Sequence, residues 1–154
     1  MRRQTWFATV VCAIAVIPGC FLGALFKILM YIFGGWLNGS DFLYLHVLFG
    51  IETPNIIYEW VFAHAIPSFI QAMIGGYFAV WVMEKLAYGA DYRSAAMITG
   101  ALYTGALVCL TILTLPTIGP LVSDMLISII QCVGIWIGLN SAVNELPAPR
   151  KVAA

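Results

Sequence analysis

The sequence predicts an all-α fold, a four-transmembrane-helix bundle with both termini cytoplasmic and a short interfacial segment on the outer face. Composition is the first observation, because 62% of the 154 residues are hydrophobic and 9% are charged, whereas a typical soluble domain is roughly 25% charged. The second is a set of four apolar runs, each long enough to cross a hydrocarbon core about 30 Å thick. We therefore take residues 1–154 as a single integral membrane domain.

The distribution of basic residues is the third observation, and it orients the bundle. Lys and Arg collect in cytoplasmic loops. Of the seven basic residues, all but Lys27 lie before the first run, around the turn after the second, or after the fourth. These six are Arg2, Arg3, Lys85, Arg93, Arg150 and Lys151. Both termini are therefore expected on the cytoplasmic side.

The first span is predicted at about residues 6–37, which is longer than the roughly 20 residues that a bilayer requires. We expect this helix to tilt, to kink at Pro18 or to project beyond the membrane. A turn follows, and then a short apolar segment at about 41–49 that contains His46. This segment is too short to span, so an interfacial position on the outer face fits it best.

The remaining spans are predicted at about residues 56–86, 94–115 and 121–143. The second is again long for a bilayer and contains Pro67. The residues between the third and fourth, 116–120, include two prolines and a glycine and form a minimal turn. The last two spans must therefore form an antiparallel hairpin.

Polar residues recur at one spacing in the second and fourth spans. Each set falls at i, i+4 and i+7, which is one face of a helix, and both helices run inward from the outer side. The spacing predicts an outward-opening polar seam in which equivalent residues lie at similar depth. Either these groups hydrogen-bond the helices together, or they bind a solute, an ion or a lipid head group. The seam residues are His64, Ser68, Gln71, Asp124, Ser128 and Gln131.

Small residues recur at four-residue spacing in three of the predicted spans. In lipid, such pairs allow two helix backbones to approach closely. They indicate packing either within the bundle or between subunits. The residues are Gly19, Gly23, Ala101, Gly105, Gly134 and Gly138.

Charged residues on the outer side form a second candidate group of Lys27, Asp41, Glu52 and Glu59. We expect Lys27 to form an ion pair or to extend its ammonium group outward to water. No His or Cys spacing typical of a metal site is present, so no metal is expected. Ligation of a haem or pigment by His64 is kept as an alternative to the absence of a cofactor.

No catalytic motif is recognisable, and the net charge of zero disfavours a nucleic-acid partner. The first hypothesis is a non-catalytic small integral membrane subunit that assembles with itself or with a larger membrane complex in the lipid bilayer. The alternative is a small oligomeric transporter or channel that uses the polar seam. Minimal loops and the lack of sorting signals favour a prokaryotic plasma (inner) membrane.

The last part of the chain carries a family resemblance. Its residues are a glycine-containing turn with an aromatic-basic pair (YGADYRSA, 88–95), Tyr103, a Pro-x-x-Gly turn (LPTIGPLV, 115–122) and the tripeptide 137–139. Over about residues 84–143 the chain resembles the Yip-type family of polytopic membrane proteins, named for interaction with Rab GTPases. The resemblance implies a small helical bundle and leaves the biochemical role open. Rab binding is not expected, because few residues precede Trp6 where eukaryotic members carry a long cytoplasmic region.

Overall fold

The computed structural model describes residues 2–38, 61–114 and 121–146, and all of the regular structure in these ranges is helical. These ranges contain four α-helices and one short π-helix. Their bounds are α1 (Arg2–Asn38), η1 (Val61–Ala65), α4 (Ile66–Leu86), α5 (Tyr92–Thr114) and α6 (Leu121–Glu145).

The prediction of an all-α fold with four membrane-length helices is confirmed. Each α-helix contains a segment long and apolar enough to cross a membrane: Gln4–Leu29, Ile66–Leu86, Tyr92–Leu113 and Met125–Glu145. The start of the predicted second span, at 56–60, lies outside the described residues. The predicted interfacial segment at 41–49 also lies outside them.

Helix α1 runs as one continuous α-helix through Pro18. Its 37 residues correspond to about 55 Å at 1.5 Å per residue. This length exceeds the hydrocarbon thickness of about 30 Å. The candidate membrane segment within it covers 26 residues, so part of the helix must tilt or extend beyond the bilayer.

The second predicted span contains a change of helix type near Pro67. The π-helix η1, which includes His64, leads directly into α4, and Pro67 occupies the first turn of α4. Proline is tolerated there because the first backbone N–H groups of a helix have no partner within it. Pro67 therefore marks the start of the regular α-helix and lies outside its interior.

A tight turn joins α4 to α5. Gly89 has a positive φ of 79°, which a residue without Cβ adopts without steric cost. Asp91 follows and caps α5: its carboxylate accepts hydrogen bonds from the backbone N–H of Ser94 at 3.1 Å and from the Ser94 hydroxyl at 2.6 Å. The turn is thus fixed by one glycine and one cap.

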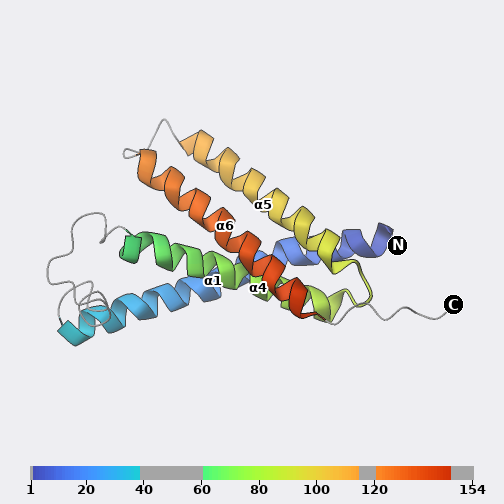
Figure 1. Cartoon of the computed structure of the whole chain (residues 1–154), viewed down its shortest axis with the longest axis horizontal. Helices are drawn as coiled ribbons and strands as arrows, with labels where there is room; N and C mark the ends of the chain where they lie inside the picture. Colours follow the sequence, from blue (N-terminus) through green and yellow to red (C-terminus); the bar gives the residue numbers. More distant parts are fainter. Residues whose placement is uncertain (1, 39–60, 115–120, 147–154) are drawn as a thin grey trace.

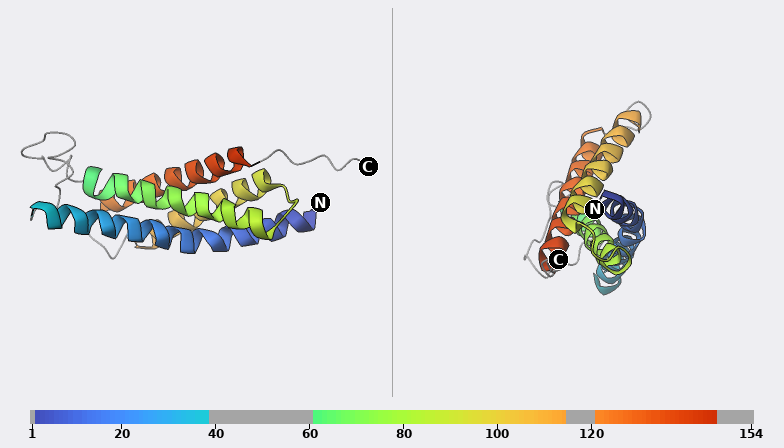
Figure 2. Two further views of the ribbon diagram at one scale, coloured as in Figure 1. Left: turned by 90° about the horizontal axis from the view of Figure 1, so that it is seen from below. Right: turned by 90° about the vertical axis from the view of Figure 1, so that its right-hand side faces the viewer.

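The four α-helices differ in how extensively they contact one another. The most extensive contacts join α1 to α4 and α4 to α6, while α5 lies against α6 and α1 and barely touches α4. Figure 1 shows that α1 begins, and α6 ends, at the same end of the bundle, which we call the terminal end. Toward the opposite end, the hairpin end, α5 and α6 diverge from the α1–α4 pair (Figures 1 and 2).

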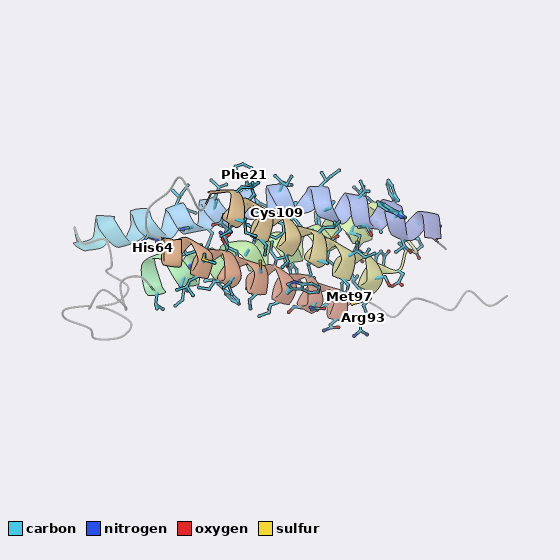
Figure 3. The ribbon with its side chains drawn as sticks, turned by 90° about the horizontal axis from the view of Figure 1, so that it is seen from above. Phe21, His64, Arg93, Met97 and Cys109 are labelled. Carbon is cyan, nitrogen blue, oxygen red and sulfur yellow. The ribbon has the colours of Figure 1, made fainter. Side chains whose placement is uncertain are left out.

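The buried core is built from small side chains. Nine of the fifteen residues in the main buried cluster are alanine, and the largest are Met83, Ile135 and Leu139. Such a core brings helix backbones close together and is stabilised by van der Waals contact. Large apolar side chains such as Phe21, at 70% exposure, point away from the bundle (Figure 3), as expected for a surface covered by lipid.

Candidate functional site

The polar residues of α4 face α1. Ser68 is 2% exposed, and the ammonium group of Lys27 donates a hydrogen bond to its hydroxyl at 3.5 Å. One turn further along α4, the Gln71 side-chain amide donates to the backbone carbonyl of Cys20 at 3.4 Å. Lys27 is half-buried, so Ser68 provides part of the polar environment that this cation requires within an apolar helix.

Two glycines of α1 allow this approach. A Cβ atom placed on Gly23 would lie 2.6 Å from the Gln71 carbonyl oxygen, and one on Gly19 would lie 2.8 Å from the carbonyl oxygen of Gly75. Both distances are shorter than van der Waals contact. The α1–α4 contact, and with it the bond from Gln71 to Cys20, therefore depends on the missing side chains of Gly19 and Gly23.

The polar residues of α6 lie elsewhere. The hydroxyl groups of Ser128 and Thr111 of α5 are 3.1 Å apart. Trp136 donates its indole N–H to the Thr104 hydroxyl at 3.0 Å, and its ring covers Gly100. These contacts hold α6 against α5.

The described contacts thus join the two serines of the predicted seam to different helices, and the pairing of the two polar stripes stays a prediction. Ser68 bonds to α1 and Ser128 to α5. The face of α4 that meets α6 is formed by Phe69, Ala72 and Met73, and it packs against Gly134. This face is rotated by one residue from the Ser68 face, so the interhelical contact is made by small and apolar groups.

The other members of the predicted seam are placed as follows. Gln131 is half-buried on α6. His64 is exposed on η1, at the hairpin end of α4 (Figure 3). Asp124 lies in the first turn of α6, and its side chain is outside the described residues.

A polar group that sequence analysis missed lies in the middle of the bundle. The Tyr103 side chain of α5 lies beside the thiol of Cys20 of α1. Since Gln71 bonds the Cys20 carbonyl, α1, α4 and α5 all contribute to this group. Toward the terminal end, Thr99 contacts the Cys12 thiol and donates to the carbonyl of Thr9 at 3.5 Å.

A signal for this group was present in the sequence. The positions in α1 that carry these contacts share one helical face, as their three- and four-residue spacing requires. The face consists of Thr9, Cys12, Gly19, Cys20, Gly23 and Lys27. We define the polar line as Lys27, Ser68, Gln71, Cys20 and Tyr103, which follow one another into the bundle from the side of Lys27.

The predicted small-residue pairs divide into two kinds. Four glycines pack helices together within the chain: Gly19, Gly23, Gly134 and Gly138. A Cβ on Gly134 would lie 2.6 Å from the Phe69 carbonyl oxygen, and a Cβ on Gly138 would lie even closer to the Met73 carbonyl oxygen. In contrast, Ala101 is exposed, and a Cβ on Gly105 would meet no atom within 4 Å. This third pair faces away from the bundle.

The remaining candidates are the metal ligands and the outer charge cluster. Among the described residues, no three His, Cys, Asp or Glu side chains are close enough to hold a metal ion. In the outer charge cluster, Lys27 is placed against Ser68, while Asp41, Glu52 and Glu59 lie outside the described ranges. The bond from Lys27 to Ser68 is thus the part of this cluster that the structure defines.

One carboxyl group outside the membrane-spanning segments has a shifted pKa. The hydroxyl and the backbone N–H of Ser94 both donate to Asp91, and they lower the pKa of its carboxyl group from the ordinary value. Asp91 is therefore held in its charged form at the start of α5, where the helix dipole also favours an anion.

Comparisons of the chain with protein-family profiles, with curated proteins and with solved structures gave no match.

Proposed function

We propose that the protein is a non-catalytic integral membrane subunit that assembles with a second copy of itself through α5. The contact surface is the α5 face, which we define as Met97, Ala101, Gly105, Cys109 and Ile112. All five residues are exposed and follow one another at three- or four-residue spacing. Figure 3 looks onto this helix, with Met97 and Cys109 labelled along it.

Gly105 is the observation that carries the proposal. Every other glycine of the helices for which contacts are described has another helix or a tryptophan ring within 3.0 Å of its would-be Cβ. Gly105 has open space. A glycine in a helix interior costs roughly 1 kcal/mol relative to alanine in water, and in lipid its benefit is close approach by another helix. A second copy of the α5 face provides such a helix.

The small buried share of α5 also supports a subunit contact through this helix. Inside the chain, 17% of the residues in the α5 span are buried, compared with 33% for α1, 39% for α4 and 28% for α6. Helix association in lipid depends on packing and not on apolar burial from water. A narrow stripe of small residues on the least covered helix is therefore the surface best suited to a subunit contact.

The basic residues support one orientation of this assembly in the membrane. The start of α1, the end of α4 and the start of α5 all lie at the terminal end, and they contain Arg2, Arg3, Lys85 and Arg93. By the preference of cytoplasmic segments for Lys and Arg, we assign the terminal end to the cytoplasmic side of a prokaryotic plasma membrane. The Yip-type resemblance is compatible with such a bundle and specifies no activity.

Oxidative cross-linking tests the contact, because Cys109 is an exposed cysteine on the α5 face. Copper-phenanthroline treatment of membranes should give a disulfide-linked dimer that Cys109→Ala abolishes. Gly105→Leu should also reduce it strongly, since the side chain separates the two helices. The matched control is Cys109→Ala with Val133→Cys, which moves the cysteine to an exposed position on α6.

Equal cross-linking from positions 109 and 133 would contradict the proposal, because it would report random collision in the bilayer. A larger complex would instead give co-purification with another membrane protein at fixed stoichiometry in mild detergent. In that case Gly105→Leu should release the partner while no dimer through Cys109 forms.

Transport is the second candidate function, and the polar line favours it. A half-buried lysine within an apolar helix, followed by Ser68 and Gln71, is expensive in lipid. If these groups conduct a solute, liposomes containing the protein should show flux, and Gln71→Leu should abolish it. No flux across a broad panel of ions and small solutes would leave the polar line with a packing role.

A further inference from the structure

The surface between α4 and α6 contains a hollow that the assembly through α5 does not use. Its volume is about 420 Å³, and the exposed lining is entirely apolar. Met73, Ile74 and Phe78 of α4 form one wall, and Gly138 of α6 lies at the other. Figure 1 shows α6 crossing α4 in this region, toward the terminal end.

The packing of Gly138 creates the hollow. Gly138 lies so close to the Met73 carbonyl that no side chain fits between the helices. Neither Gly138 nor the small Ser141 has a side chain large enough to fill the space beside this contact. The result is an apolar groove on the surface between the two helices, which can hold a flexible hydrocarbon chain.

One end of the groove is aromatic and acidic. Tyr77 and Trp81 line it, with 42% and 51% of their surface exposed. The Tyr77 hydroxyl donates a hydrogen bond to Oε2 of Glu145, at the end of α6. Within residues 2–38, 61–114 and 121–146, no Lys or Arg forms an ion pair with Glu145. A carboxylate and two aromatic rings thus stand where the apolar groove reaches the terminal end of the bundle.

We propose that this groove binds phosphatidylethanolamine, with an acyl chain between α4 and α6 and the ammonium group at Glu145. Charge complementarity selects the head group. An ammonium N–H donates to a carboxylate in a charge-assisted hydrogen bond, and exposed Tyr and Trp rings attract the same cation. A lipid whose head group is only anionic is repelled by Glu145. A choline head group has the charge but no N–H to donate.

Quenching of Trp81 fluorescence by brominated lipids tests the proposal. The protein is placed in phosphatidylglycerol nanodiscs that contain a minor, equal fraction of one brominated lipid, with an ethanolamine, choline or glycerol head group. The contribution of Trp81 is the difference from the Trp81→Phe variant. Brominated phosphatidylethanolamine should quench Trp81 at about threefold lower lipid fraction than the other two lipids, as expected for one exposed cation–aromatic and carboxylate contact.

Two variants separate the head group from the chain. Glu145→Gln keeps the size of the side chain and removes its charge, so the ethanolamine preference should be lost. Ser141→Phe fills the groove and should reduce quenching by all three lipids. The matched control is Glu84→Gln, which removes another carboxylate near the terminal end, one that is paired with Lys85 at 3.8 Å; the preference should persist.

Equal quenching by the three lipids in the unmodified protein would overturn the proposal, because it would describe a groove without head-group selection. So would equal quenching by ethanolamine and choline lipids, since the donor N–H is the selected feature. This comparison uses no variant other than Trp81→Phe. A folded Glu145→Gln protein that keeps the preference would also exclude Glu145 as the acceptor.

Discussion

At the scale of single residues, two helical glycines occupy opposite environments. Gly138 is buried against the backbone of α4, whereas Gly105 faces open space on α5. The two glycines cannot be told apart by sequence pattern, because each lies four positions from another small residue. Only the position of the neighbouring helix distinguishes a packing glycine inside the chain from one available to another subunit.

The first prediction concerns this pair. Gly138→Leu should lower the free energy of unfolding by about 1–3 kcal/mol, because a side chain there displaces the Met73 backbone. Gly105→Leu should leave it nearly unchanged in detergent and should affect the cross-linked dimer alone. Thermal unfolding followed by circular dichroism measures both. Equal destabilisation by the two substitutions would contradict the different environments of the two glycines.

The second prediction concerns the cap of α5. Asp91→Asn should destabilise the protein at neutral pH, since the carboxylate accepts two hydrogen bonds from Ser94. Replacement of such a cap by alanine costs about 1 kcal/mol, and asparagine should cost less, because it keeps one acceptor oxygen and loses the charge. Ser94→Ala, which removes the hydroxyl donor and keeps the N–H, should have a smaller effect.

The pH dependence of this cap follows from the lowered pKa of Asp91. A carboxyl group with a lower pKa in the folded state contributes its full stability above the unfolded pKa of about 3.9. That contribution is lost as pH falls from this value through the folded pKa. The difference in unfolding temperature between the wild type and Asp91→Asn should therefore be constant from pH 7 to about pH 5 and decrease below about pH 4. A constant difference in unfolding temperature down to pH 3 would indicate that the negative charge of Asp91 does not contribute to stability.

At the scale of elements, the contact between α5 and α6 depends on one tryptophan. Trp136 donates to Thr104 and covers Gly100. Trp136→Phe and Thr104→Val should each destabilise the protein, and their combination should cost less than the sum by about 0.6 kcal/mol, the average for a hydrogen bond between membrane helices. A double-mutant cycle measured by unfolding in detergent gives this coupling. Strict additivity would mean that the bond contributes nothing.

The helices themselves were largely predictable from sequence, but their pairing was not. The spans predicted at 94–115 and 121–143 correspond to α5 (Tyr92–Thr114) and α6 (Leu121–Glu145), since apolar runs of sufficient length must be helical in lipid. The Ser68 and Ser128 stripes have the same spacing, yet spacing does not specify which neighbour a face meets. A rotation of one residue placed Ser68 against α1 and Phe69 against α6.

The mid-bundle contact between Tyr103 and Cys20 shows a second limit. Cysteine behaves as a small hydrophobe in most cores, so sequence composition gave Cys20 no polar role. Its contact with Tyr103 depends on α5 lying against α1. Such crossing points arise from the packing of glycines and alanines on several helices at once, and no single helical pattern encodes them.

At the scale of the whole molecule, the orientation in the membrane is open to a direct test. Tyr88, in the turn between α4 and α5, is 88% exposed and should lie on the cytoplasmic side. In Tyr88→Cys, a membrane-impermeant maleimide should label position 88 only after the cells are permeabilised. A cysteine at position 45 should be labelled in intact cells. The unmodified protein is the control for the native cysteines, all of which lie within helices, and the reverse labelling pattern would invert the topology.

The divergence of α5 and α6 from the α1–α4 pair bears on how the chain matures in the cell. The α1–α4 contact is the most extensive in the bundle, whereas α5 barely touches α4. During synthesis, α1 and α4 leave the ribosome first and can dock before the second hairpin exists. The later hairpin then anchors mainly through the α6 glycines, which leaves α5 on the outside of a finished core. The α1–α4 pair of a newly made chain would thus dock before the α5 face is synthesised, so that this step of folding precedes the proposed subunit assembly.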